Sequence, residues 1–451
     1  MIRSEHLRSA VIASDRFRIA SAVWGACYRV ARAQFVRALL RNQRRAGYEL
    51  CAIFELGSRR PVQYRHGISD IDVTVVVSHV TPELLRRLWA VIFAAKRRIP
   101  VLGECEIYSA DEFQEYLRFG PGTAGAMKVP QRLWSRSDFP IGDTQLAEFP
   151  CVDRFDLLRD ALFRYARYYL PSYYASLKSS SSASHAVLHH LEERVLLTID
   201  PEGRNENFRL PVSKPSASLL RVLRALDRAC TRSSPDDGRD QAKASATLDE
   251  LGLTRKVLRF ESGLVAISAF APREEYVVLQ VVDQLDLDKE VPGRAALPAG
   301  LRRAVWPTNV PIVVTPAIWR ALQHLFPFEY CLGGTATRSM TQESEAAHPT
   351  RSTFVDRIRG EYASLLSLAN VWPVEPRIDP RQRYADFVWE LDIYSEFLRS
   401  GHLQLLQPVK KFESAEAAYT AMKIAIGEVR ALLELEPHYG RVAPQRMVKD
   451  E

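Results

Sequence analysis

The sequence lacks several features that mark common classes of protein. Its six cysteines are scattered, with no C-x-x-C pair and no histidine at metal-ligand spacing, so neither a zinc motif nor a disulfide framework is indicated. No run of about 18 uncharged apolar residues occurs, so we expect no membrane span. The first 20 residues carry charges every few positions and are not expected to form a secretory signal peptide. These absences favour a cytoplasmic protein without a membrane partner.

The composition is that of a globular protein with a moderate excess of positive charge. The chain has 451 residues, of which 47% are hydrophobic and 25% are charged, enough for two or three domains. Lysine and arginine total 61 against 54 acidic residues, a formal net charge of +7. Arginine outnumbers lysine, and its planar fork suits phosphate. The balance therefore favours anionic partners such as nucleotides or RNA.

Hydrophobic periodicity predicts a small mixed α/β unit in the first part of the chain. The expected elements are a helix over 15–46, strands over 48–58 and 69–78, a helix over 81–98, a strand over 103–109 and a helix over 109–119. Ser14 or Asp15 is expected to cap the first helix. Ser109 and Glu112 have the spacing of a capping box at the start of the last one. Residues 126–150 are expected to form a connecting loop.

Residues 55–78, ELGSRRPVQYRHGISDIDVTVVVS, place two aspartates one residue apart in an expected strand. Residues two apart in a strand point to the same face, so Asp70 and Asp72 are expected to lie together. Ile71 and Val73 then face the core. Two neighbouring carboxylates repel each other, and a bridging divalent cation is the most natural way to stabilise them. A few oxygen ligands are typical of Mg²⁺, which keeps waters and takes phosphate oxygens.

Neighbouring segments offer further polar groups. Glu104 and Glu106 share a face of the strand expected over 103–109, which could lie beside the aspartate strand. A third carboxylate there could complete a two-metal site and deprotonate a hydroxyl. Upstream, Gly57 and Ser58 are expected to form a tight turn, whose N–H groups and hydroxyl can hold phosphate.

These residues carry a resemblance to a known family. ELGS, followed after eleven residues by DIDV, resembles the signature of the polymerase-β-type nucleotidyltransferase superfamily. The fragment GISDIDVTVVV is especially similar to bacterial members, including antibiotic adenylyltransferases and minimal nucleotidyltransferases. The resemblance covers roughly residues 20–120. A second D-x-D, at Asp286 and Asp288, has no Gly-Ser before it, so only residues 55–78 combine the two parts of the signature.

The resemblance implies a role for each matching residue. Gly57 and Ser58 would bind the triphosphate of a nucleotide such as ATP. Asp70 and Asp72 would bind Mg²⁺, with two ions expected and Mn²⁺ as an alternative. An acid on the following strand would complete the site.

Two of these assignments stay open in the sequence. Glu106 is favoured as the third metal-binding and catalytic carboxylate because it occupies the middle of its strand, with Glu104 as the alternative. Arg59, directly after Ser58, is expected either to bind the nucleotide phosphates or to carry surface charge.

The predicted fold class is α/β (α+β), a nucleotidyltransferase fold with a short mixed sheet flanked by helices, followed by larger, mainly helical modules. The expected domains are a catalytic domain over 1–150, a helical module over 151–240 and an α/β to helical acceptor-binding module over 241–451. Strands of that last module are expected within 256–270, 274–285 and 310–316.

The expected activity is Mg²⁺-dependent transfer of a nucleoside monophosphate from a nucleoside triphosphate to a hydroxyl acceptor, with release of pyrophosphate. The basic balance favours a nucleotide or RNA as acceptor. A small molecule of the antibiotic type and a protein hydroxyl are alternatives. The rival interpretation is a non-catalytic module of the same fold that senses nucleotide or binds a partner.

Overall fold

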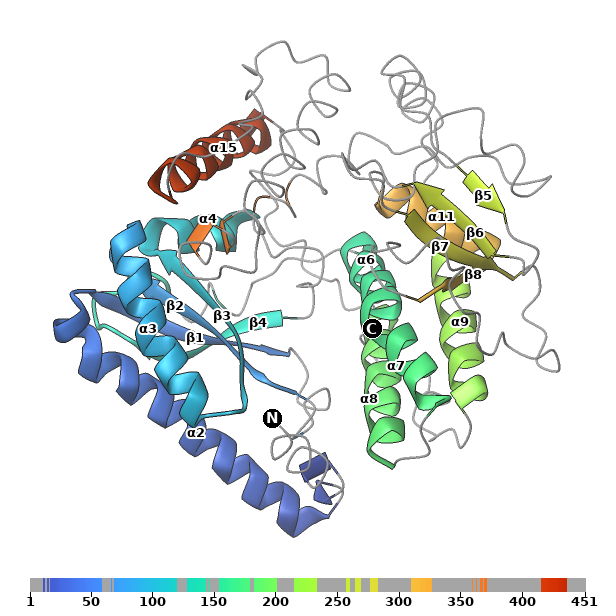
Figure 1. Ribbon diagram of the computed structural model, residues 1–451, viewed down its shortest axis with the longest axis horizontal. Coiled ribbons are helices and arrows are strands. Elements are labelled where there is room, and N and C mark those ends of the chain that lie inside the picture. Colours follow the sequence, from blue (N-terminus) through green and yellow to red (C-terminus); the bar gives the residue numbers. More distant parts are fainter. Residues whose placement is uncertain are drawn as a thin grey trace, which may run out of the picture. The chain divides into compact units, whose positions relative to one another are not determined.

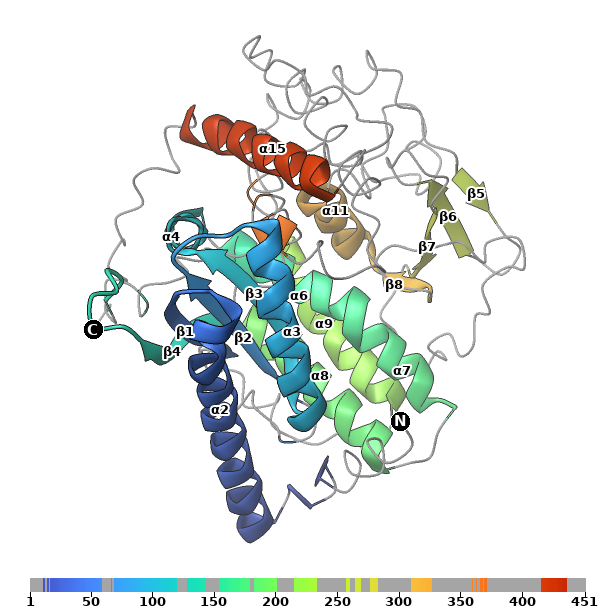
Figure 2. The ribbon, with the colours of Figure 1, turned by 60° about the vertical axis from the view of Figure 1, so that its left-hand side comes forward.

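The structure is a computed structural model, and its chain divides into two compact units (Figures 1 and 2). It describes residues 11–12, 14–15, 17–58, 66, 69–119, 128–142, 146, 154–178, 182–200, 215–232, 257–259, 264–268, 276–282, 310–326, 359, 362, 366–367, 369–370 and 415–435. Unit 1 comprises Met1–Val152, Ile358–Ala385 and Leu406–Glu451, and unit 2 comprises Asp153–Arg357 and Asp386–Leu405. The three domains expected from the sequence stay a prediction.

Unit 1 is built on a four-stranded mixed sheet. Its strands are β1 (Leu50–Ser58), β2 (Ile71–Val77), β3 (Leu102–Ser109) and β4 (Lys128–Ser135), in the order β3-β2-β1-β4. β1 runs antiparallel to both of its neighbours, and β2 and β3 are parallel. The mixed α/β class and the first three strands are thereby confirmed, including the pairing of the glutamate strand beside the aspartate strand.

The expectation of a loop over 126–150 is wrong in part, because β4 lies within it. The sequence KVPQRLWS hides this strand, since Pro130 has no N–H to donate and demotes the run as a strand signal. β4 lies at the edge of the sheet and pairs with β1 alone, so Pro130 needs no partner on its outer side.

Helix α2 (Arg18–Ala46) packs its buried residues Tyr28, Ala31, Phe35 and Leu39 against the sheet, and their steps of three and four residues place them on one side of the helix. Gly47 ends the helix in the left-handed conformation, with φ of 68°. The predicted cap is wrong: the helix begins at Arg18, after Phe17. Ser14 and Asp15 precede it and make other contacts.

Helix α3 (Pro82–Arg98) lies with α2 on one face of the sheet, and the two helices and the inner strand residues form one core (Figure 1). Thr81 caps α3 by accepting a hydrogen bond from the N–H of Leu84. Among the described residues, no helix has the length and apolar character needed to cross a membrane.

Helix α4 (Ala110–Phe119) contributes aromatic rings to the other face of the sheet. Its Phe113 stacks on Phe54 of β1, with ring centroids 4.8 Å apart. The predicted capping box is confirmed: Ser109 and Glu112 each accept a hydrogen bond from the other's N–H. Helix α4 therefore starts immediately at the end of β3.

Unit 2 combines helices with a second small sheet. Its described helices are α6 (Arg154–Arg164), the π-helix η2 (Tyr165–Tyr169), α7 (Leu170–Ser176), α8 (Ser182–Ile199), α9 (Pro215–Arg232) and α11 (Pro316–Leu325). Its strands are β5 (Val257–Arg259), β6 (Leu264–Ser268), β7 (Tyr276–Val281) and β8 (Ile312–Val314), in the order β5-β6-β7-β8. Only the β7–β8 pairing among these is parallel. All four strands lie where the sequence predicts strands.

Buried charges in unit 2 are paired. Asp160 of α6 is fully buried and lies 2.7 Å from the Nε of Arg164. Glu192 of α8 accepts a hydrogen bond from the hydroxyl of Ser218 and pairs with Arg221 of α9. Such pairing offsets the cost of removing a charge from water.

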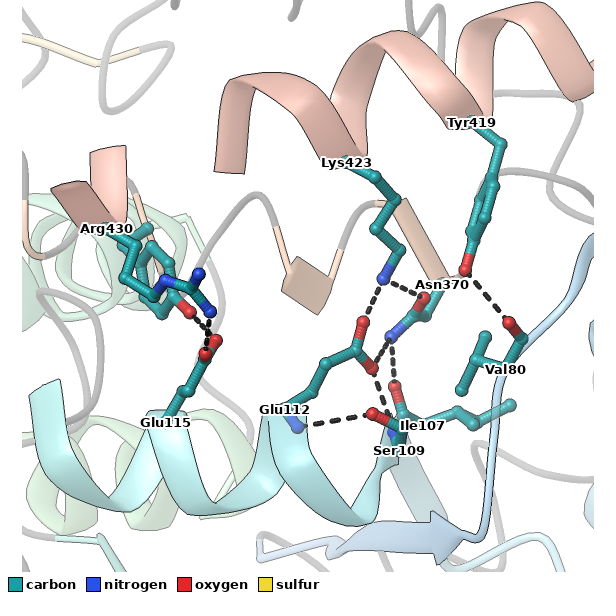
Figure 3. A network of polar contacts seen from close by, with 10 residues as sticks. Val80, Ile107, Ser109, Glu112, Glu115, Asn370, Tyr419, Lys423 and Arg430 are labelled. Atoms are coloured by element: carbon teal, nitrogen blue, oxygen red, sulfur yellow. Dashed lines mark hydrogen bonds and ion pairs between the residues drawn. The ribbon is translucent and has the colours of Figure 1, made fainter. Parts of the chain in front are cut away.

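Two late segments of the chain return to unit 1 and bind its helix α4 (Figure 3). Helix α15 (Ala415–Leu435) contributes Lys423, which pairs with Glu112, and Arg430, which pairs with Glu115 at 2.6 Å. The fully buried Asn370 donates to the carbonyl of Ile107 and to the carboxylate of Glu112, and accepts from Lys423. We call these contacts the Asn370 network.

We expect Asn370→Ala to lower the free energy of unfolding by about 2 kcal/mol, because it leaves the buried carbonyl of Ile107 and the Lys423 ammonium short of a partner. The midpoint of urea unfolding measures the effect. Arg86→Ala is the control: Arg86 pairs with Glu83 on the exposed face of α3, and its loss should cost less than about 0.5 kcal/mol. Equal midpoints for the two variants would contradict a supporting role of Asn370.

Candidate active site at the ends of three strands

The strand registers bring the residues of the predicted motif to one edge of the first sheet. Glu55 of β1 pairs with Val73 of β2 in antiparallel register, so the last residues of β1 lie beside the first of β2. Ile71 of β2 pairs with Leu102 of β3 in parallel register. The end of β1 and the starts of β2 and β3 therefore meet, as the interpretation of residues 55–78 requires.

The two aspartates occupy different positions at this edge. Asp70 directly precedes β2 and is exposed, whereas Asp72 lies inside the strand and is half-buried. The N–H of Glu104 donates to the Oδ1 of Asp72 at 3.0 Å. Ile71 and Val73 are buried in the core that α2 and α3 cover, as predicted. This confirms the strand alternation on which the expected aspartate pair depends.

Gly57 and Ser58 are still part of strand β1. Gly57 pairs with Val129 and Ser58 with Lys128 of β4, so the expectation of a turn at these two residues is wrong. The pairing with β4, which the sequence did not predict, extends the strand through them. A Cβ on Gly57 would lie 2.7 Å from the side-chain nitrogen of Gln131, so a larger residue there would displace the Gln131 side chain. Arg59 lies outside the described residues.

Gly103 is a site residue that the motif did not identify. A Cβ at this position would lie 2.4 Å from the Oδ1 of Asp72 and 2.7 Å from the Cβ of Asp70, so only glycine leaves room for both aspartates. The register between β2 and β3 shifts at this point. A glycine inside a strand is itself a signal that another group approaches the backbone closely. Gly103 in the run LGECEIYS is such a signal.

The two candidate glutamates differ in their surroundings. Glu106 pairs in register with Thr74, which is two residues from Asp72 and so points to the same face. The phenol of Tyr108 donates to Glu106 at 3.1 Å, and the hydroxyl of Thr74 lies 3.5 Å from the same oxygen. Burial, followed by the charge of Glu106, raises the pKa of Tyr108, so the phenol stays protonated and can donate. Glu104 is exposed.

The face of the sheet that α2 covers has its own buried charge pair close to the edge. Glu55 of β1 is 5% exposed and binds Arg32 of α2 through two contacts, Nε to Oε2 at 2.5 Å and a terminal nitrogen to Oε1 at 2.7 Å. On the same face, burial raises the pKa of Cys105 to about 12, which keeps its thiol neutral. Glu55 and Cys105 therefore lie on the opposite face of the sheet from Asp72 and Glu106.

The carboxylate oxygens at this edge are hard donors of the kind that Mg²⁺ and Mn²⁺ prefer. Gly103 leaves room for Asp70 and Asp72, the N–H of Glu104 binds Asp72, and two further carboxylates, Glu104 and Glu106, lie on the next strand. Within the described part of the chain, no group of three or more His, Cys, Asp or Glu side chains is close enough to hold a metal ion as it stands. The donor set fits a cation carried by two aspartates and completed by water or phosphate oxygens.

Comparison of the chain with protein-family models, with curated proteins and with solved structures gave no match. The resemblance to the nucleotidyltransferase superfamily therefore stays a prediction from the motif.

We expect Gly103→Ala to weaken binding of Mn²⁺ by at least about tenfold, because the new methyl group displaces one or both aspartates, and to destabilise the fold by about 1–3 kcal/mol. Electron paramagnetic resonance of free Mn²⁺ and urea unfolding measure the two effects. Gly142→Ala is the matched control, since a Cβ there meets nothing within 4 Å. Unchanged Mn²⁺ affinity in Gly103→Ala would mean that the aspartates are not the ligands.

Proposed function

We propose that the chain is a Mg²⁺-dependent nucleotidyltransferase, which moves a nucleoside monophosphate from a nucleoside triphosphate to a hydroxyl acceptor. The observation that carries the proposal is the placement of Asp70 and Asp72 beside the end of β1, with Gly103 making room for both. A pair of adjacent acids on one face of a sheet edge is costly unless it binds a cation. The triphosphate would bind at the end of β1, where Gly57 and Ser58 lie next to the start of β2.

The chemistry would proceed by attack of the acceptor oxygen on the α-phosphorus. The bond from this phosphorus to the bridging oxygen of the β-phosphate breaks, and pyrophosphate leaves. Asp70 and Asp72 would hold Mg²⁺, which when bound neutralises negative charge on the phosphates. Glu106 would take the acceptor proton, and its hydrogen bond from Tyr108 would keep its carboxylate oriented.

The basic balance of the chain supports a nucleotide or RNA as the acceptor. A net charge of +7 favours an anionic substrate over a cationic one. The module proposed to hold the acceptor is the one expected over 241–451. If the acceptor is instead a small molecule or a protein hydroxyl, the label in the experiment below would appear in the small-molecule or protein fraction.

We expect Asp70→Asn and Asp72→Asn each to lower turnover by at least about 100-fold, equivalent to about 2.7 kcal/mol of barrier, because each removes a charge from the cation site. The measurement is transfer of label from each α-labelled nucleoside triphosphate, with Mg²⁺ and a cell extract, into RNA, protein or small molecules. Asp138→Asn is the matched control, since Asp138 pairs with Arg136 on an exposed surface.

Label transfer that survives in both aspartate variants would exclude this mechanism. Mg²⁺-dependent binding of nucleotide with no label transfer in any fraction would instead support a non-catalytic nucleotide-sensing module.

A comparison of Glu106→Gln with Glu104→Gln tests the third carboxylate. We expect Glu106→Gln to reduce kcat by at least about tenfold, since the amide cannot accept a proton, and Glu104→Gln to change it by less than about threefold. Both variants keep the size of the side chain. The reverse ranking would assign the role to Glu104, whose own N–H binds Asp72.

A further inference from the structure

A residue between the two parts of the motif is bound to the start of the chain. The ring Nδ1 of His66 lies 2.7 Å from the Oδ1 of Asp15, and the backbone N–H of His66 donates to the Oδ2 of the same carboxylate at 3.2 Å. Both side chains are mostly buried, at 14% and 11% exposed. One carboxylate thus holds both the ring and the backbone of His66.

Helix α2 also contacts His66 and Ser69, the residues that precede Asp70. The phenol of Tyr28, which is 3% exposed, donates to the backbone carbonyl of Ser69 at 3.1 Å. The Tyr28 ring also packs edge-on against the ring of His66, with centroids 5.0 Å apart. A Cβ on Gly25, one turn earlier in α2, would lie 3.8 Å from His66, so the imidazole lies directly on the helix.

The short segment that carries Asp15 is itself fixed to α2. The indole N–H of Trp24 donates to the hydroxyl of Ser14 at 2.9 Å, and that hydroxyl donates to the carbonyl of Val11 at 3.1 Å. We refer to the contacts of Asp15 with His66, and of Tyr28 with His66 and Ser69, as the α2 clamp.

The α2 clamp acts where the sheet does not. The strand ladder of β2 begins at Ile71, whose N–H donates to the carbonyl of Val101, so Asp70 lies one residue outside it. The bond from Tyr28 to the Ser69 carbonyl is on the peptide group that joins Ser69 to Asp70. This hydrogen bond therefore restricts the movement of the backbone on the N-terminal side of Asp70, which lies outside strand β2.

We propose that Tyr28, Asp15 and His66 are positioning residues, which hold the backbone before Asp70 so that the two aspartates bind one divalent cation. The inference rests on the proposed function, because it assumes that Asp70 and Asp72 are the cation ligands. Preorganisation of the pair lowers the cost of bringing two like charges together when the ion binds. None of the three residues needs to touch the ion.

Tyr28→Phe separates positioning from stability, and Tyr48→Phe is its matched control. Tyr48 is also buried and donates its phenol to a backbone carbonyl, that of Leu39 near the other end of α2. Each substitution removes one such hydrogen bond and keeps the ring. Both should lower Tm by a similar few degrees, about 2–4 °C.

The readout is Mn²⁺ affinity, measured by electron paramagnetic resonance on the full chain, with Asp72→Asn to show that binding depends on the acid pair. We expect Tyr28→Phe to weaken Mn²⁺ binding by about fivefold, the effect of one hydrogen bond, and Tyr48→Phe to leave it within about twofold. Asp15→Asn should weaken it in the same direction, because it removes the charge that binds the His66 ring.

Three outcomes are distinguishable. Wild-type protein that binds no Mn²⁺ would overturn the proposed function and this inference with it. Wild-type binding that Asp72→Asn abolishes, but that Tyr28→Phe and Tyr48→Phe leave equal, would overturn the α2 clamp alone. Weaker binding in Tyr28→Phe and Asp15→Asn, with normal binding in Tyr48→Phe at a matched loss of Tm, is the result that we expect.

Discussion

Repulsion between Asp70 and Asp72 is the constraint that the proposed cation site has to satisfy. Two like charges in close contact, about 4 Å apart, repel by roughly 1 kcal/mol in water and by about 4 kcal/mol at the effective dielectric of a protein surface. One hydrogen bond to a carboxylate offsets only part of this. The structure applies several restraints together: the absent side chain of Gly103, the N–H of Glu104, and the bond from Tyr28 to Ser69. A bound cation, as proposed above, would balance the remaining repulsion between the two charges.

Segments from the end of the chain hold the first sheet at the end of β3, where α4 begins. Asn370 joins the end of β3, helix α4 and helix α15 through its side chain (Figure 3). Its backbone carbonyl accepts a hydrogen bond from the indole of Trp89 on α3. Phe113 of α4 then stacks on Phe54 of β1. The contacts thus run from the late helix through α4 to strand β1, and the Asn370 network stabilises the sheet that carries the carboxylates.

Most of the local structure of unit 1 could be predicted from the sequence, because it is specified by neighbours in the chain. The alternation around Asp72 and the capping box of Ser109 and Glu112 are of this kind. Strand β4 was missed because Pro130 weakens the local signal and the partner strand is distant. The hydrogen bonds of Tyr28 to Ser69 and of Asn370 to its partners were missed for a related reason, since each joins residues 41 or more positions apart, with no periodic pattern to mark them.

The bond between Trp89 and Asn370 spans 281 positions of the chain, with most of unit 2 encoded between them. During synthesis at about 5–20 residues per second, residue 370 emerges roughly 15–60 s after residue 89. Until residue 370 emerges, β3 and α4 lack the Asn370 network and can have only their strand and capping contacts. Unit 2 can complete its own core sooner, as its main segment is continuous from Asp153 to Arg357. The order of folding would therefore reverse the order of the sequence: the unit that is begun first is finished last.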